Sequence, residues 1–225
     1  MSDLTELECD LLTEAFNIGL GAGSAALSEL LGEEILVTVP SLSIQPKRPV
    51  IDHFAVLFDE RTHTIRQTFF SPENETLFSG DAFLFISEKS SRALTEFLTD
   101  SQIPEEEVLT ELGNIVLHAC LGSLANMLDT ELESDIPVVH MHRTSDILVR
   151  MVRNDAESQA EEEMSTADRE RRNLSEDQDP VLLLGLHFKT AEREIDGDVM
   201  LFLELAKLAE LKKQIGTALK KLSLP

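Results

Sequence analysis

The chain has 225 residues, with 42 acidic residues against 19 lysines and arginines, so its formal net charge is −23. Binding of a nucleic acid or an anionic membrane needs a basic face, and this charge argues against both kinds of partner. Hydrophobic residues make up 42% of the chain, which is enough for one globular domain with a substantial core.

The start of the chain and its cysteines predict a cytoplasmic protein. The first ten residues hold four acidic side chains and no basic one, unlike a secretory signal peptide. The longest apolar stretches, such as residues 181–186, have the length of a strand, whereas a membrane span needs roughly 20 residues. Cys9 and Cys120 form neither a Cys-x-x-Cys pair nor a disulfide framework, as expected in a reducing compartment.

In the first half, a long helix is predicted before a group of strands. Leu7, Leu11, Phe16 and Leu20 approximate a helical stripe within residues 4–31. Short runs rich in β-branched and aromatic residues then predict strands at 35–39, 55–58, 64–70 and 82–86, and a helix at 88–98 closes this half.

The second half repeats this order of elements. Its long helix is indicated by apolar residues at helical spacing, namely Leu109, Leu112, Val116, Leu124 and Leu128. Strands are predicted at 136–141, 147–152, 181–188 and 199–203, and a helix at 205–222. The simplest architecture is an α/β domain in which helices cover one sheet.

The two long helices carry the same sequence pattern, which indicates an internal repeat. Both contain Leu-Thr-Glu-x-x-Asn-Ile, and a proline follows 23 residues after each asparagine. At an offset of 97 residues, the first copy has Glu14, Asn17 and Pro40, and the second has Glu111, Asn114 and Pro137. We therefore expect a single pseudo-two-fold domain over 1–225, made of repeats 1–103 and 104–225, with sheet pairing across the halves.

The second repeat is longer than the first. Residues 80–85 resemble residues 197–202 at an offset of 117, so the second half has gained 20 residues. The gain is placed at 155–180, an acidic stretch with few large apolar residues, which predicts a surface loop. A docking segment for a basic partner is the alternative.

The repeated pattern places polar side chains on one face of each helix. Asp10, Glu14 and Asn17 follow one another at spacings of four and three residues, as do Glu107, Glu111 and Asn114. A solvated polar face is the ordinary explanation of such spacing. Glu-x-x-Asn alone is a weak signal, because residues 170–173 also contain it without the later proline.

The combination with proline resembles the CheC/CheX/FliY phosphatases of bacterial chemotaxis and flagellar signalling. The motif of that family is Asp or Ser, then Glu after three residues, Asn after two and Pro after 22. The first copy fits it in full, whereas the second has Glu107 at the first position. Two copies are similar to the two-site CheC type rather than to CheX, which keeps one, or to FliY, which has an additional region.

This resemblance implies hydrolysis of the phosphoaspartate on a CheY-type response regulator. Asn17 and Asn114 would position the attacking water, and Glu14 and Glu111 would anchor the receiver through its lysine. Phosphoryl transfer needs such positioning more than a nucleophile on the protein, and an amide offers water both a donor and an acceptor.

The remaining implications concern supporting residues and partners. Asp10, Glu107, Pro40 and Pro137 would have supporting roles. No cofactor is expected on this chain, because the Mg²⁺ ion belongs to the receiver. A CheD-type receptor deamidase is a further partner that the resemblance implies. The alternative function is a non-enzymatic docking module of the chemotaxis or flagellar switch apparatus, similar to FliM middle domains.

Other features of the sequence favour ordinary structural roles. The glycines of residues 19–23 favour close helix packing over a phosphate loop, since no strand precedes them. His140 and His142 lack further metal ligands at a suitable spacing. Cys120 is expected to be a buried thiol rather than a nucleophile. The closing helix at 205–222 is expected to pack in the core rather than on a membrane.

Overall fold

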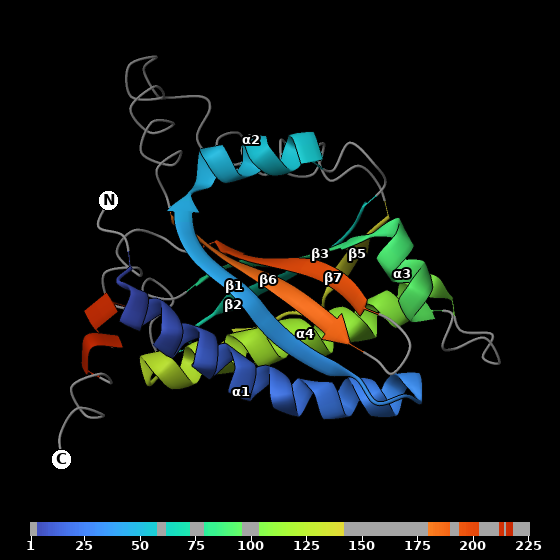
Figure 1. Ribbon diagram of the computed structural model, residues 1–225, viewed down its shortest axis with the longest axis horizontal. Helices are drawn as coiled ribbons and strands as arrows, with labels where there is room; N and C mark the ends of the chain where they lie inside the picture. The colour runs from blue at the N-terminus through green and yellow to red at the C-terminus, as the bar shows by residue number, and fades with distance from the viewer. Residues whose placement is uncertain are drawn as a thin grey trace.

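A computed structural model describes residues 4–57, 62–72, 79–95, 104–141, 180–189, 194–202, 212–213 and 215–217. In this part of the chain, one seven-stranded antiparallel sheet packs against two long helices, α1 (Glu6–Leu31) and α4 (Glu105–Leu128). The two helices run side by side along one face of the sheet, and α2 (Lys47–Leu57) lies on the other side (Figure 1). The predicted α/β fold is confirmed.

Helix α1 begins with a capping box. The Thr5 hydroxyl accepts a hydrogen bond from the Glu8 backbone N–H at 3.3 Å, and the Glu8 carboxylate accepts one from the Thr5 N–H at 2.7 Å. These bonds satisfy backbone donors that no helical carbonyl can reach. The helix ends at Gly32, whose φ of 70° is in the left-handed region that glycine adopts without a steric penalty.

Helix α4 begins without a side-chain cap. It follows Pro104, and its first turn contains Glu105, Glu106 and Glu107, whose negative charge is favourable at a helix N-terminus. Residues 105–127 have the length and hydropathy of a membrane span, but 56% of the tested stretch is buried inside the molecule. Helix α4 is therefore a core helix, which packs against α1 and the sheet.

The sheet is built from strands of both halves. Their bounds are β1 (Leu36–Pro46), β2 (Thr62–Phe70), β3 (Ser79–Ser87), β4 (Glu133–Ser134), β5 (Val138–His140), β6 (Pro180–Lys189) and β7 (Glu194–Phe202). The order is β1-β6-β7-β3-β2-β4, with β5 also paired to β2. The predicted pairing across the halves is confirmed, because β1 pairs with β6, β2 with β4 and β5, and β3 with β7.

Counted inward from either edge, the sheet has the same arrangement of strands from the two halves. Each half contributes an outer strand that pairs with the other half, while β3 and β7 pair in the middle with Phe83 opposite Met200. These two residues are 117 positions apart, which is the offset found between the two similar segments of the sequence. A duplication would produce this order, although the boundary at 103/104 stays a prediction.

Small residues allow α1 and α4 to pack closely. A Cβ atom on Gly19 would meet the Ser123 hydroxyl and lie 2.9 Å from the Ala119 carbonyl oxygen, and one on Gly23 would lie 3.3 Å from Ala119 Cβ. Contacts that move backwards along α4 as they move forwards along α1 show that the helices are antiparallel. The predicted packing role is confirmed for Gly19 and Gly23, but not for Gly21, where a Cβ atom would have no described atom within 4 Å.

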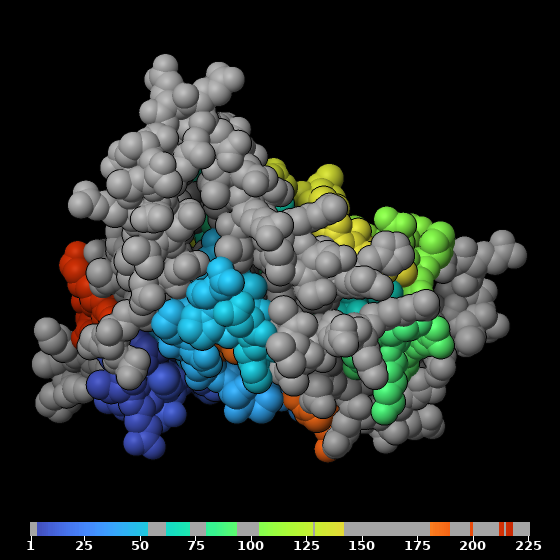
Figure 2. Space-filling model, turned by 90° about the horizontal axis from the view of Figure 1, so that it is seen from above, coloured from blue at the N-terminus to red at the C-terminus, as the bar shows by residue number. Residues whose placement is uncertain are grey.

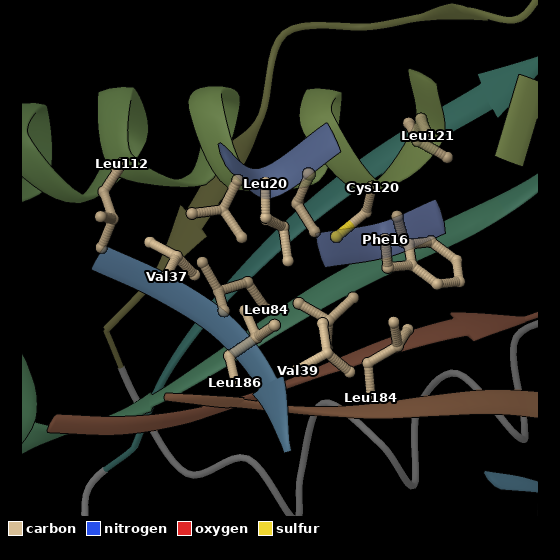
Figure 3. Close-up of a cluster of buried hydrophobic side chains, with 14 of the residues drawn as sticks. Phe16, Leu20, Val37, Val39, Leu84, Leu112, Cys120, Leu121, Leu184 and Leu186 are labelled. Carbon is tan, nitrogen blue, oxygen red and sulfur yellow. The ribbon is translucent and has the colours of Figure 1, made fainter. Parts of the chain in front are cut away.

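The main core lies between the helix pair and the sheet. Figure 3 shows Phe16 and Leu20 of α1 directed toward the same cluster as Cys120 of α4 and Leu184 of β6. All four are at most 1% exposed. Burial of this cluster is the main driving force that holds both helices on one face of the sheet.

One predicted strand was wrong. Residues 55–57 form the end of α2, and Phe58 lies outside the described residues. A short apolar run cannot distinguish a strand from the end of a helix. The signals for the helix are Pro49 in its first turn, the Arg48–Asp52 ion pair across four residues, and the burial of Val50 and Ile51. Figure 2 shows α2 at the surface on its side of the molecule.

Several predicted elements lie partly or wholly outside the described residues. The helix predicted at 88–98 is observed as α3 (Glu88–Thr95). Residues 147–152 and the insertion up to residue 179 are outside the described part of the chain. Of the closing helix, residues 212–213 and 215–217 are described and helical, and Ile215 is fully buried in the core.

Candidate functional site

The first motif copy lies on the outer face of α1. Asp10 and Glu14 are exposed and Asn17 is half-buried, whereas Leu12 and Phe16 between them are buried. The helical period therefore separates the polar motif residues from the core. The two carboxylates are available to a partner, while Asn17 lies where the helix meets the sheet.

Asn17 is hydrogen-bonded to the edge of the sheet. Its Oδ1 atom accepts a hydrogen bond of 2.8 Å from the backbone N–H of Val39 in β1. Ser24 Oγ accepts a similar bond of 2.9 Å from the N–H of Val37. Among the described strands β1 is an outer one, so its second row of backbone donors faces no described strand, and side chains of α1 occupy that place.

Pro40 marks an irregularity in β1 beside Asn17. The pairing of β1 with β6 shifts between Thr38 and Ser41, so two residues of β1 stand opposite Leu186. A proline has no N–H to donate to the ladder, which makes a bulge on an edge strand a suitable place for it. The asparagine and the proline of the motif therefore meet at one bulge, although 22 residues separate Asn17 from Val39.

The second motif copy lies near the start of α4. Glu107 and Glu111 are exposed, and Asn114 is half-buried. The two glutamates line a surface groove of about 500 Å³ together with Leu30, which is near the end of α1. A partner could therefore reach the second copy through an open groove, which is lined by these two glutamates and by the apolar Leu30.

The strand that carries Pro137 of the second motif copy is broken rather than bulged. Residues 135–137 separate β4 from β5, and Pro137 within them is buried. The break is held by the neighbouring strand β2. Gln67 Nε2 donates to the Asp135 carbonyl at 2.9 Å and to Ser134 Oγ at 3.0 Å, and the Asp135 N–H donates to the Thr68 carbonyl at 3.0 Å.

The two copies are separate sites. Gly19 lies against Ser123 and Gly23 against Ile115, so Asn17 lies across from about residue 125 of α4. Asn114 is then about 11 residues further along the same axis, which is roughly 16 Å at 1.5 Å per residue. The motif residues of one copy are therefore too distant to act on the same phosphoryl group as those of the other.

Sequence reasoning placed the motif residues on the correct helix face, but it missed their contacts with the sheet. Neither the bond from Val39 to Asn17 nor the role of Gln67 was predicted. A usable signal was present for one contact, since Asn17 and Ser24 are seven residues apart and share a helix face. No pattern in the sequence shows that Gln67 lies beside residue 135.

The described residues offer no metal site. No three His, Cys, Asp or Glu side chains in this part of the chain come together as ligands. The pKa of His140 is lowered by burial and by the charge of Arg66. Burial raises the pKa of the Cys120 thiol to about 12, which makes this residue unsuitable as a nucleophile at neutral pH. His142 lies outside the described residues.

A segment of the chain is similar in sequence to a protein of the flagellar motor switch. The flagellar motor switch phosphatase FliY of Bacillus subtilis (strain 168) is 37% identical to this chain over 54 residues. The match covers 24% of this chain and only 14% of FliY, far less than two thirds of that protein. No model of a protein family matches the chain.

Two solved structures share the fold over almost the whole chain. FliY of Thermotoga maritima has a TM-score of 0.63 and 15% identity, over 95% of this chain and 98% of that one. The FliM middle domain of H. pylori has a TM-score of 0.59 and 8% identity, over 93% and 99% respectively. At these identities the similarity shows the fold alone, and the expected closer relationship to two-site CheC stays a prediction.

Proposed function

We propose that this chain is a member of the CheC/CheX/FliY family, to whose FliY proteins it is similar, and that it hydrolyses the phosphoaspartate of a CheY-type response regulator. The observation that carries the proposal is an exposed Glu and a half-buried Asn on each of two helices, each helix being followed in the chain by a proline in an irregular strand. The surface carboxylates can bind a basic group of the receiver, and the amide is held close to the helix surface.

The chemistry requires no group beyond those of the two proteins. A phosphorylated receiver supplies the phosphoaspartate and the Mg²⁺ ion, so the reaction needs a positioned water and a means of docking. In this proposal a motif asparagine, Asn17 or Asn114, positions water, Glu14 and Glu111 contact the receiver lysine, and Asp10 and Glu107 extend the acidic surface. The reaction would occur in the cytoplasm, which is consistent with two free thiols.

A non-enzymatic docking module is the second candidate function. The observation in its favour is that the FliM middle domain has the same fold, so the fold does not decide between them. Binding of a partner through the acidic motif surface would serve either function. A CheD-type partner is an expectation from the family resemblance.

The deciding experiment measures decay of a phosphorylated CheY-type receiver in Mg²⁺ with catalytic amounts of this protein. We expect acceleration by the unchanged protein and none by the Asn17→Ala/Asn114→Ala double variant. A matched control is Asn173→Ala, which changes the third Glu-x-x-Asn of the sequence and should retain full activity. Receiver binding without acceleration by the unchanged protein would support the docking module instead.

A further inference from the structure

The two motif copies differ in the hydrogen bonding of their asparagines. Asn17 Oδ1 already accepts the Val39 N–H. Within the described residues, the Asn114 side chain makes no hydrogen bond. The oxygen of a primary amide has two lone pairs, so Asn17 already uses one of them and is held in place by that bond, while both are available on Asn114.

A second contact explains why Asn114 is available. In the second copy Gln67 of β2 holds the strand break through Asp135 and Ser134. In the first copy the residue opposite the bulge is Leu186 of β6, whose side chain has no polar group to offer. The first irregular strand is therefore held by the hydrogen bond to Asn17. The second is held by Gln67, so it does not need a hydrogen bond to Asn114.

The backbone beside each asparagine differs in the same way. Val39 is 4% exposed and its N–H bonds to Asn17. The corresponding residue of the second copy, Ile136, is 81% exposed. The backbone N–H of Val39 is therefore occupied by its bond to α1, whereas Ile136 is accessible to a partner.

From these contacts, and resting on the proposed function, we infer that the two copies have different roles. Asn114 is the residue that positions water for hydrolysis. Asn17 is a positioning residue for β1, acting with Ser24, which binds the next alternate N–H of the same strand. Turnover then depends on the second copy, despite its departure from the family motif at Glu107.

The test compares alanine and aspartate variants at both positions in the full-length protein. Asn17→Asp retains an oxygen that can accept the Val39 N–H, but it loses the amide donors. We expect Asn17→Asp to unfold at the same urea concentration as the unchanged protein and to keep its rate within about twofold. Asn114→Ala and Asn114→Asp should unfold normally and lose about 100-fold in rate, as when a positioned polar group is removed from an active site.

Ser24→Ala provides the matched control for a purely structural role. It removes a bond to β1 without changing a motif residue, so Ser24→Ala and Asn17→Ala should both lower the urea midpoint. Both should retain most of their rate under conditions in which they are folded. Loss of rate by Asn17→Asp at unchanged stability, together with an active Asn114→Ala, would overturn the inference.

Failure of the proposed function would give a different result. If the unchanged protein does not accelerate decay, no rate comparison applies, and the phosphatase proposal fails. The urea midpoints still test the role of Asn17, because a lower midpoint in Asn17→Ala that is restored in Asn17→Asp supports its bond to β1. Equal midpoints in all three proteins would contradict that role.

Discussion

At the scale of single residues, close packing of α1 and α4 depends on the absence of side chains. Gly19 and Gly21 lie two positions apart on α1 but have different surroundings. A Cβ atom on Gly19 would meet α4, whereas a Cβ atom on Gly21 would have no described atom within 4 Å. Alanine at Gly21 therefore changes mainly the helix propensity of α1, whereas alanine at Gly19 also disturbs the packing of α1 on α4.

We predict opposite effects on stability for alanine at the two glycines. Gly19→Ala should destabilise the protein by about 1–3 kcal/mol, because the helices must move apart or Ser123 must change rotamer. Gly21→Ala should stabilise it by about 0.5–1 kcal/mol through the lower backbone entropy of the unfolded chain. Urea unfolding measures both. Equal effects at the two positions would show that the helices do not pack as described.

The two cysteines should differ in reactivity. Cys120 is fully buried and its pKa is raised to about 12 by desolvation, while Cys9 is half-buried with a smaller rise in pKa from the same cause. Only the thiolate reacts with iodoacetamide. At pH 8 we expect mass spectrometry to show slow modification of Cys9, and of Cys120 only after urea is added. Rapid modification of Cys120 in the folded protein would contradict its burial.

At the scale of elements, the capping box decides where α1 begins and so where the first motif copy starts. The pKa of Glu8 is lowered chiefly by the Thr5 backbone N–H, and then by the Thr5 hydroxyl. A lowered pKa means that the ionised carboxylate stabilises the folded state. This stabilisation is present above the unfolded value of 4.5 and is lost as the pH falls through the lower folded value.

Thr5→Ala should destabilise the protein by about 1 kcal/mol, as expected for loss of an N-cap hydroxyl. Thr5→Ser is the matched control and should be close to the unchanged protein in its free energy of unfolding.

A second prediction concerns the carboxylate of the capping box. Glu8→Gln should be less stable than the unchanged protein at pH 7 and indistinguishable from it near pH 3. Thermal unfolding at both pH values measures this, and a difference that persists at low pH would mean that the charge of Glu8 is not the cause.

At the scale of the whole molecule, the halves exchange their outer strands. Within each half only β2–β3 or β6–β7 pair, while the other pairings of the described strands join one half to the other. A pair of strands alone is marginally stable in water. The two motif helices are thus positioned by a sheet that neither half can build alone.

We predict that residues 1–103 and 104–225 do not fold separately. Each fragment alone should show little cooperative unfolding by circular dichroism, and mixing equal amounts should restore a folded complex. The full chain should unfold in one transition, because its core is shared. A cooperative transition in either isolated fragment would argue against the shared sheet as the source of stability.

The sequence by itself determined the α/β class, the two long helices, and the face on which Asp10, Glu14 and Asn17 lie. These features depend on residue periodicity, which is local and repeats along the chain. The similar segments at offsets of 97 and 117 residues also led to the expected pairing across the halves. Residues 55–57 were assigned wrongly because a short apolar run has no periodicity to distinguish a helix from a strand.

Only the tertiary structure decided how the two copies differ. Val39 reaches Asn17 across 22 residues, and Gln67 reaches Asp135 across 68, so no local pattern encodes either contact. Both bonds depend on which backbone donors and acceptors the sheet leaves unpaired at an irregular strand. That is a property of the register between distant strands, and it distinguishes two sites that look almost identical in the sequence.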